Sequence, residues 1–287
     1  MAHYLDPKND LVFKRIFGEH PDLLISFLNA LLPLEKDGFI NSLEYLTPEL
    51  VPDNPTKKFS IVDVRCKDKR GRYFIVEMQM EWNAAFLNRM VFNTSKVFVN
   101  QMVVNENYNS LSPVYSLGIL NKNFETKTAE FYHRYRLQNP NNPDEILPGL
   151  EFVLLELPKF IPEKLADRKM AVLWLRFLKE VHEQNDQVSE ELMENKEIRK
   201  AMDMCEKGGF TPEELALYEK YQDAIRTENA ALETSMKEGE AKGLAEGLAK
   251  GLAEGLAKGE KEREELKQAI AESQQEIAEL KRLLNKK

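Results

Sequence analysis

Residues 59–80, FSIVDVRCKDKRGRYFIVEMQM, contain the pattern that decides the fold. Two runs rich in β-branched and aromatic residues, 59–66 and 73–80, are separated by the charged segment KDKRGR, which includes Gly71. Such runs on either side of a short glycine-containing segment are typical of a β-hairpin. The pattern therefore predicts an antiparallel pair of strands that turns near residues 69–70.

The hairpin brings acidic side chains to one face, because side chains on a strand alternate between its two faces. The residues expected to share a face are Ile61, Asp63 and Arg65 on the first strand and Ile75, Glu77 and Gln79 on the second. The predicted turn pairs Asp63 with Glu77 and places their Cβ atoms about 5 Å apart. Burying two carboxylates that close costs several kcal/mol unless one binds a proton or a cation bridges them.

A divalent cation is the simplest compensation for this pair. Mg²⁺ prefers oxygen ligands and commonly takes one or two protein carboxylates together with water and phosphate oxygens, and Mn²⁺ accepts similar ligands. Asp63 and Glu77 are thus candidate metal ligands for phosphodiester hydrolysis, in which Gln79 would orient water or phosphate. Gln79 itself is neither a cation nor a base. The residues alone leave open a half-exposed hairpin whose acids pair with Arg65 or Arg72.

The charge of the chain is unevenly distributed. The 287 residues are enough for one sizeable folded domain with appended helical segments, and their net charge is −8. Residues 1–136 carry 17 Lys and Arg against 16 Asp and Glu, whereas residues 137–287 carry 23 against 32. The acidity belongs to the second half, so a DNA-binding surface on the first half is compatible with the charge.

The sequence also disfavours several classes of protein. Cys66 and Cys205 fit no paired or metal-ligand spacing, which predicts a reducing, cytoplasmic location. No apolar run approaches the roughly 20 residues that span a bilayer, and the first residues lack a signal-peptide pattern, so we expect no membrane partner. The four histidines show no zinc spacing and no GxxxxGK[ST] motif occurs, which disfavours a zinc site and nucleotide hydrolysis.

Hydrophobic periodicity predicts helices and strands around the hairpin. The expected helices are two within 10–32, then 84–104, 164–183 and 190–206, and the expected strands are 114–120, 130–137 and 152–157. The segment 139–149, NPNNPDEILPG, is expected to be a loop. Thr211, followed by Pro212 and Glu214, predicts a helix start. Together these elements indicate an α/β fold with a mixed sheet flanked by helices.

The tail changes character at Gly239. Gly-Leu-Ala-Glu/Lys recurs every four residues as far as Gly259, and each glycine costs about 1 kcal/mol of helix stability relative to alanine, so the repeat predicts a weak isolated helix. A heptad pattern follows, with Ile270, Ile277 and Leu284 at a and Leu266, Ser273 and Leu280 at d. It favours either a coiled coil that joins copies of the chain or a solvated single helix. The expected organisation is a core at 1–160, a helical region at 161–235 and the tail at 236–287.

Five blocks of sequence occur in a characteristic order within about residues 4–225. They are DLVFKRIFG, SIVDVRCKDKRGRYFIVEMQM, the predicted helix containing Arg89, SLSPVYSLGIL and LELPKF. This order resembles the Rpn family of recombination-promoting nucleases and transposases, which belongs to the PD-(D/E)XK superfamily, and the GLAEGLAKG tail is similar to tails in that family. The resemblance implies a restriction-endonuclease-like core with a mixed sheet flanked by helices, and an Mg²⁺-dependent DNA endonuclease linked to recombination or mobile elements. The alternatives are a catalytically weak DNA-binding protein and a coiled-coil interaction scaffold.

By this resemblance, Asp63 and Glu77 match the two acids of the motif, and Gln79 matches the position usually held by lysine. Glu-x-Gln is common in the family, which leaves the source of positive charge in the site open. Lys14 and Lys96 are candidates for a displaced lysine.

Two further groups of residues are expected near the site. Asp10 matches the acidic position of the family's opening helix block, where it would either reach the same metal or favour the helix N-terminus. The basic residues flanking the site are Lys57, Lys58, Lys67, Lys69, Arg70 and Arg72. They would either contact DNA phosphates without reading sequence or form a charged hairpin tip. A homodimer or higher oligomer through the C-terminal helix would let two such sites act on two strands.

Overall fold

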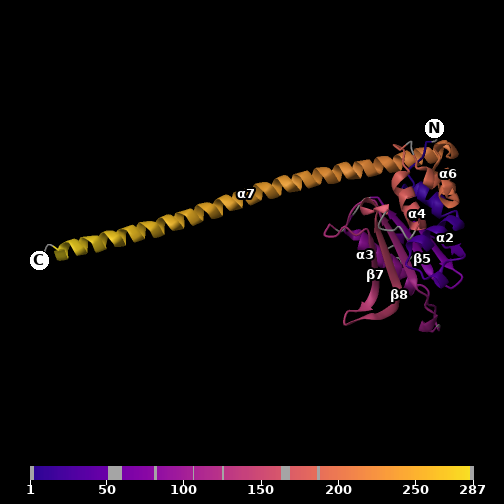
Figure 1. Ribbon diagram of the computed structural model, residues 1–287, viewed down its shortest axis with the longest axis horizontal. Coiled ribbons are helices and arrows are strands. Elements are labelled where there is room, and N and C mark those ends of the chain that lie inside the picture. The colour runs from indigo at the N-terminus through magenta and orange to yellow at the C-terminus, as the bar shows by residue number, and fades with distance from the viewer. Residues whose placement is uncertain are drawn as a thin grey trace. The chain divides into compact units, whose positions relative to one another are not determined.

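A six-stranded sheet forms the centre of the computed structural model (Figure 1). The structure describes residues 3–50, 60–80, 83–105, 107–124, 126–162, 169–185 and 188–284. In their order across the sheet, the strands are β1 (Leu43–Tyr45), β4 (Val64–Asp68), β5 (Tyr73–Gln79), β6 (Val114–Leu120), β8 (Asn142–Glu156) and β7 (Tyr132–Asn139). β5, β6 and β8 run parallel, whereas the other neighbouring pairs are antiparallel. The predicted mixed sheet is confirmed.

The predicted strand 59–66 is broken into two. Its first part, β3 (Ser60–Ile61), pairs with β2 (Glu49–Leu50) in a separate two-stranded sheet, and its second part is β4. The chain bends at Asp63, between these strands, so the expected common face of Ile61, Asp63 and Arg65 does not form along one continuous strand. The prediction failed because β-propensity does not indicate which partner each end of a run will find.

The predicted loop 139–149 is also wrong, because most of it belongs to β8. Residues 142–149 pair only with β7, and pairing with β6 begins at Leu150. Proline lacks an N–H group and is tolerated where one side of a strand has no neighbour. The prolines and asparagines of this stretch are therefore compatible with a two-stranded arm, although their composition is typical of a loop.

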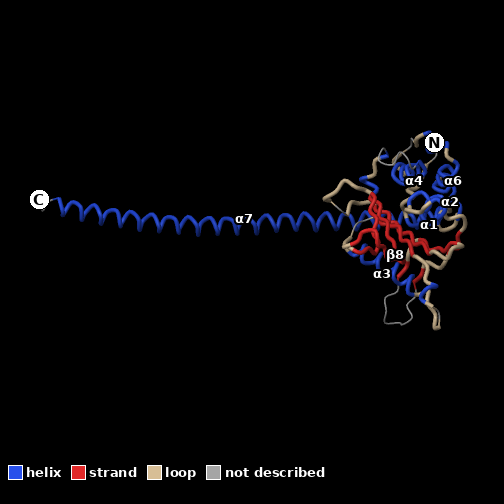
Figure 2. Tube along the Cα trace, turned by 60° about the horizontal axis from the view of Figure 1, so that its bottom comes forward, coloured by secondary structure: helices blue, strands red, loops and turns tan. Residues whose placement is uncertain are grey.

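Helices cover both faces of the sheet (Figure 2). Those whose apolar residues join the larger core include α1 (Asp10–Phe17), α2 (Pro21–Leu31), α4 (Lys169–Glu180) and α6 (Lys196–Cys205). The opposite face is covered by α3 (Ala85–Val99). Alternation along β5 follows this division, since Phe74 and Val76 enter the larger core and Ile75 packs on the α3 side. Glu77 is two residues after Ile75, so its side chain points to the same face of the sheet and lies under α3.

The remaining short elements refine the predicted boundaries. The expected helix 190–206 is two helices, α5 (Glu190–Glu194) and α6, because Asn195 stands between them and its side chain caps α6 by accepting a 3.1 Å hydrogen bond from Ile198 N–H. The 3₁₀ turns that lie wholly within the described residues are η1 (Lys36–Gly38), η2 (Tyr108–Ser110), η3 (Leu157–Lys159) and η5 (Lys207–Gly209). The described helices include none long and apolar enough to cross a membrane.

Contacts divide the chain into two units, Met1–Ile225 and Arg226–Lys287, and α7 (Pro212–Leu284) begins in the first and continues through the second. Thr211 and Glu214 form the predicted capping arrangement, since each side chain accepts a hydrogen bond from the other's backbone N–H, at 3.2 and 2.7 Å. The glycine repeat is helical, and its weak stability as an isolated helix stays a prediction. Lysine and glutamate four residues apart, such as Lys242 and Glu246 at 3.9 Å, favour this helix.

A glycine allows α3 to pack closely beside Glu77. Gly118 of β6 lies next to Glu77 in the parallel register. A Cβ atom at this position would lie 2.7 Å from Leu154 and 3.3 Å from both Phe86 and Met90 of α3. The missing side chain therefore leaves room for the helix that covers the hairpin acids.

Candidate active site

The two acids of the hairpin meet where β4 begins. The pairing of β4 with β5 ends with Val64 opposite Val76, so Asp63, just before β4, and Glu77, just after Val76, are the next residues beyond the paired stretch. Oδ2 of Asp63 accepts a 2.6 Å hydrogen bond from the backbone N–H of Met78, and the charge of Glu77 acts on Asp63. The structure thus brings together the two acids that the sequence pattern pairs.

Asp63 lies in an environment that disfavours its charged form. The pKa of Asp63 is raised from its ordinary value of 3.8 to about 7, chiefly by burial and further by the negative charges of Asp10 and Glu77. The N–H of Met78 and the charge of Lys14 lower the pKa, but they do not outweigh burial. A cation beside this carboxylate would therefore be stabilising.

Glu77 is held from above by two side chains of α3. It is 5% exposed, and burial raises the pKa of its carboxyl group. Asn93 Nδ2 donates a 3.1 Å hydrogen bond to Oε1, and Arg89 Nε lies 3.5 Å from Oε2; both contacts lower the pKa of Glu77 against the effect of burial. The helix therefore contacts both oxygens of the carboxylate.

Arg89 also reaches Gln79, the residue at the motif's lysine position. Its Nη2 donates a 2.5 Å hydrogen bond to Gln79 Oε1. One guanidinium group thus contacts Glu77 and Gln79, two residues apart on β5. Neither Arg89 nor Asn93 was singled out as a site residue from the sequence.

A signal for this helix face is present in the sequence. The buried positions Phe86, Met90, Asn93 and Val97 recur at helical spacing, and Asn93 is the polar member of this stripe. A buried asparagine needs hydrogen-bond partners, so its position in the stripe indicates a polar group on the facing sheet. Arg89 lies one turn before it.

Asp10 and Lys14 lie near Asp63, on α1. Their side chains form an ion pair at 2.9 Å, and both charges act on Asp63 in opposite directions. A cavity of about 530 Å³ lies between α1 and the first turns of α7, within the first unit. Its lining includes Asn9, Asp10, Lys14, Arg15, Glu214 and Tyr221. The structure thus places both charges where they act on Asp63, while a role of Asp10 as a metal ligand stays a prediction.

Lys96 lies further along α3. Its Nζ donates a hydrogen bond to the backbone carbonyl of Leu50, and it stands 5.8 Å from the ring of Phe92. Among the basic residues of α3, it is Arg89 that contacts the motif residues directly.

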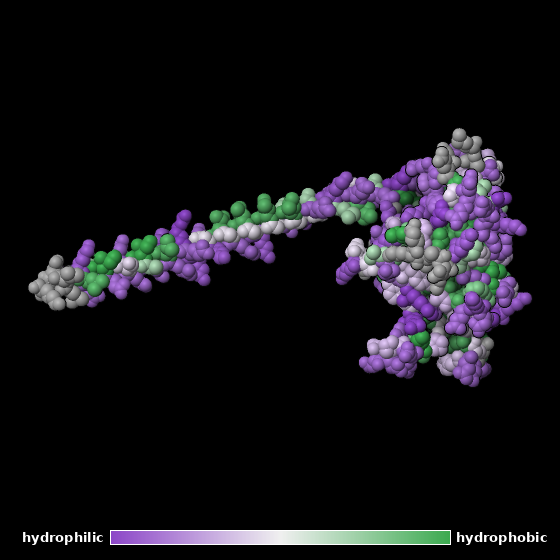
Figure 3. Space-filling view, in the orientation of Figure 1, coloured by the Kyte–Doolittle hydropathy of each residue, from purple (hydrophilic) through white to green (hydrophobic). Residues whose placement is uncertain are grey.

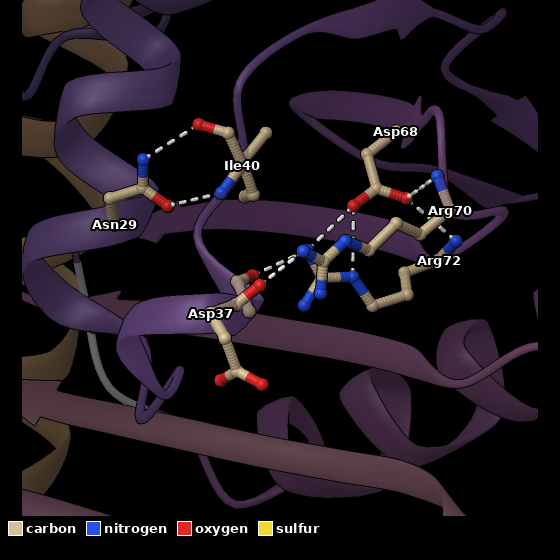
Figure 4. A network of polar contacts seen from close by, with 7 residues as sticks. Asn29, Asp37, Ile40, Asp68, Arg70 and Arg72 are labelled. Carbon is tan, nitrogen blue, oxygen red and sulfur yellow. Dashed lines mark hydrogen bonds and ion pairs between the residues drawn. The ribbon is translucent and has the colours of Figure 1, made fainter.

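The basic residues at the hairpin tip have different environments. Arg72 is 8% exposed, and its guanidinium group pairs with Asp68 at 2.7 Å and donates to the carbonyl of Gly38 (Figure 4). Arg70 donates to the carbonyl of Asp37. Lys67 stands 4.9 Å from the ring of Tyr73. Arg72 is thus an internal support of the hairpin, whereas Lys69 is exposed; Lys57 and Lys58 lie outside the described residues.

A divalent cation fits the donor set of Asp63 and Glu77. Burial raises the pKa of both carboxyl groups, and a cation would compensate their charge. Asn93 Oδ1 is buried and has no hydrogen-bond partner among the described residues, which leaves an acceptor for a water beside Glu77. The described part of the chain contains no cluster of three or more His, Cys, Asp or Glu suited to a metal. The cation would rely on two carboxylates with water and phosphate oxygens, an arrangement common for Mg²⁺.

Comparison with known sequences gives one family. The model of the family described as PD-(D/E)XK nuclease family transposase matches residues 7–235. Neither the curated proteins nor the solved structures gave a significant match. The matched stretch includes α1, the hairpin and α3, and so every side chain of the site described above.

Proposed function

The chain belongs to the PD-(D/E)XK nuclease family transposases, and we propose that it is a metal-dependent DNA endonuclease whose active site contains Asp63, Glu77 and Gln79. The observation that carries the proposal is the pair of neighbouring acids, Asp63 just before β4 and Glu77 on β5, both with a pKa raised by burial. Burying two carboxylates close together destabilises a fold, and such pairs are typical of functional sites. A cation-binding role explains why both acids are kept together.

Asp63 and Glu77 would hold Mg²⁺ or Mn²⁺. When bound, this cation would polarise the scissile phosphate and lower the pKa of the attacking water. The water oxygen forms a bond to phosphorus as one bridging P–O bond breaks, one of its protons passes to the leaving oxygen, and the other is released or stays on the product phosphate. Gln79 would orient the water or a phosphate oxygen through its amide, since it carries no charge and cannot accept the proton.

DNA is the proposed substrate, and the cations at and beside the hairpin tip support this choice. Lys67, Lys69 and Arg70 lie on the same hairpin as the two acids, where they could bind backbone phosphates of any sequence. Arg72 is excluded from such a role unless its buried contact with Asp68 opens. A link to recombination or mobile elements is proposed from the family's description as transposases.

A second copy of the chain is the proposed protein partner. A row of leucines along the repeat segment of α7 is exposed, with Leu244 and Leu248 both 76% exposed (Figure 3). The heptad residues Ile270 and Ile277 are about half exposed, at 52% and 50%. Apolar rows on one helix are stabilised by a second helix.

The two free, buried cysteines fit the proposed cytoplasmic location.

One observation favours a second candidate, a DNA-binding protein that cleaves weakly. The lysine position is Gln79, and the nearest positive charge, Arg89, already pairs with Glu77. If that pair persists when DNA binds, the site would bind the backbone without accelerating hydrolysis. An interaction scaffold built on α7 alone would not explain why Asp63 and Glu77 are buried together.

Nicking of supercoiled plasmid in Mg²⁺ separates these candidates. The wild type is expected to nick, whereas Asp63→Ala and Glu77→Gln reduce the rate by about 10²-fold or more. Asp144→Asn, on the exposed arm of β8, is a control that should nick as the wild type does. Equal rates for the wild type and Asp63→Ala would contradict the endonuclease, and retained DNA affinity would then favour the weakly cleaving candidate.

A further inference from the structure

The positive charge expected beside the two acids comes from a different element than the motif implies. In the motif, lysine would stand two residues after Glu77 on the same strand, where this chain has Gln79. We infer that Arg89, carried by α3, is the cation of the active site and binds a non-bridging oxygen of the scissile phosphodiester. The inference rests on the proposed function and adds to it the residue that would contact the substrate's charge.

Arg89 is placed where the missing lysine would act. Its Nη2 lies 2.5 Å from Gln79 Oε1, and its Nε lies 3.5 Å from Glu77 Oε2. Gln79 therefore has a second task in this site besides orienting water or phosphate, because its Oε1 atom holds the guanidinium group as a neutral acceptor. The Gln79 amide thus compensates for the missing lysine, because it fixes the position of the positive charge that Arg89 of α3 supplies.

The outer side of the guanidinium group is open. The Arg89 side chain is 40% exposed, whereas the side chain of Glu77 beneath it is 6% exposed. Arginine has five N–H donors in a planar fork, and among the described residues only Nη2 makes a hydrogen bond with good geometry. Donors on the exposed side can therefore bind a phosphate oxygen while the contact with Gln79 is kept, and a planar fork suits phosphate well.

α3 holds Arg89 rigidly enough for this purpose. The guanidinium carbon lies 5.1 Å from the centre of the Phe86 ring, on the preceding turn, and Phe86 and Met90 are buried against the sheet. Asn93, one turn further on, binds the second oxygen of Glu77. The same helix face thus orients both the carboxylate and the cation, as pre-organised charge stabilisation requires.

The other candidate cations are engaged elsewhere. Lys14 forms its ion pair with Asp10, and Lys96 donates to the carbonyl of Leu50. Arginine also differs from lysine in its chemistry, because it does not release its proton in proteins. Arg89 would stabilise the negative charge that grows on the phosphate, but it would not act as an acid or base.

The experiment compares Arg89→Ala, Arg89→Lys and the double variant Gln79→Lys/Arg89→Ala with wild type and Asp63→Ala. Single-turnover nicking of supercoiled plasmid in Mg²⁺ is measured, and thermal unfolding checks that each variant folds. Arg199→Ala, an exposed arginine on α6, is the matched control. Arg89→Ala should lose about 10²-fold or more in nicking rate, Arg89→Lys should lose less, and the double variant should recover at least a tenth of the wild-type rate, since it restores the charge at the motif position.

A second readout is independent of turnover. Affinity for a short duplex in Ca²⁺ is measured against salt concentration, and loss of one phosphate contact should reduce the slope of log affinity against log salt by about 1. An unchanged slope together with wild-type nicking by Arg89→Ala would overturn the inference while leaving the endonuclease intact. Wild-type nicking by Arg89→Ala with tighter Mn²⁺ binding would also overturn it, because Arg89 would then only neutralise Glu77. No difference between the wild type and Asp63→Ala would instead contradict the proposed function.

Discussion

The backbone N–H of Met78 donates a 2.6 Å hydrogen bond to the carboxylate of Asp63. This contact joins the point where the chain enters β4 to the end of β5, and it fixes the first acid beside the second. Because an asparagine side chain can accept the same hydrogen bond, the charge of Asp63 can be removed without removing the contact.

Asp63→Asn is expected to be more stable than the wild type, by a margin that grows as pH rises. Folding raises the pKa of Asp63 from 3.8 to about 7, so between these values the folded state binds more protons than the unfolded state. The free energy of unfolding contributed by Asp63 therefore falls as pH rises through this interval, and the loss is complete above about pH 7. In EDTA, the difference in Tm between Asp63→Asn and wild type should grow from pH 5 to pH 8.

Two comparisons make this result specific. Asp144→Asn, at an exposed position, should show no pH-dependent difference from wild type. Mg²⁺ or Mn²⁺ should raise the Tm of the wild type at pH 8 more than that of Asp63→Asn, because a ligand that binds the folded state stabilises it. A difference in Tm that does not change with pH would contradict the raised pKa.

Asn93→Leu should affect both stability and the pH profile of nicking. It removes the hydrogen bond to Glu77 Oε1, which lowers the pKa of that residue against burial. We expect a loss of about 1–3 kcal/mol in the free energy of unfolding in urea, and a shift of the acidic limb of the nicking profile to higher pH. Thr94→Val is the control, since Thr94 is equally buried but bonds to Met90 O; a matching shift in this variant would argue against the role of Asn93.

Substitutions at the hairpin tip should distinguish cations that support the fold from cations that bind DNA. Arg72→Ala leaves Asp68, whose side chain is 3% exposed, without its cation, and should cost about 3–5 kcal/mol in the free energy of unfolding. Lys69→Ala, at an exposed position, should leave stability within about 0.5 kcal/mol and weaken DNA binding uniformly across sequences. Chemical denaturation and binding titrations measure the two effects. An Arg72→Ala protein with wild-type stability would show that the Asp68 contact is not a support.

The C-terminal helix should determine the mass of the protein in solution. Removal of residues 239–287, or Ile270→Lys with Ile277→Lys, is expected to convert a dimer or higher oligomer into a monomer, measured by light scattering. In a parallel pair of heptads, Glu276 at g would face Lys281 at e of the other copy, which favours in-register association. Ser273→Leu fills the seam and should tighten the oligomer. An unchanged mass after the deletion would remove α7 from the interface.

Local patterns predicted much of this molecule, while pairings between distant segments did not follow from them. Strand alternation and the position of the turn were enough to predict the register that pairs Val64 with Val76, beside Asp63 and Glu77, because both strands belong to one hairpin. The direction in which α3 packs depends on the parallel crossover from β5 to β6, so the contacts of Arg89 with Glu77 and Gln79 could not be derived from spacing along the chain. Asn93, a polar residue within the apolar stripe of α3, did indicate from the sequence which face of this helix contacts a polar group.

The errors in the strands have the same origin. A β-rich run does not indicate that its two ends belong to different sheets, as in the break at Asp63. Turn-forming composition likewise predicts a loop at 139–149, although an arm paired on one side tolerates prolines. In the helical glycine repeat, lysine and glutamate four residues apart offset part of the cost of glycine.

The two acids, the amide and the two α3 side chains that hold them all fall within residues 63–93. The interval is a cassette, in which a strand, its hairpin partner and the following helix encode the chemistry in one continuous stretch. Transplanting it into another sheet of the same order would carry the acids and their arginine together. Substitutions in the helices that cover the opposite face would leave these residues in place if the apolar surfaces still fit, and only those at charged positions such as Asp10 and Lys14 would change the field at Asp63.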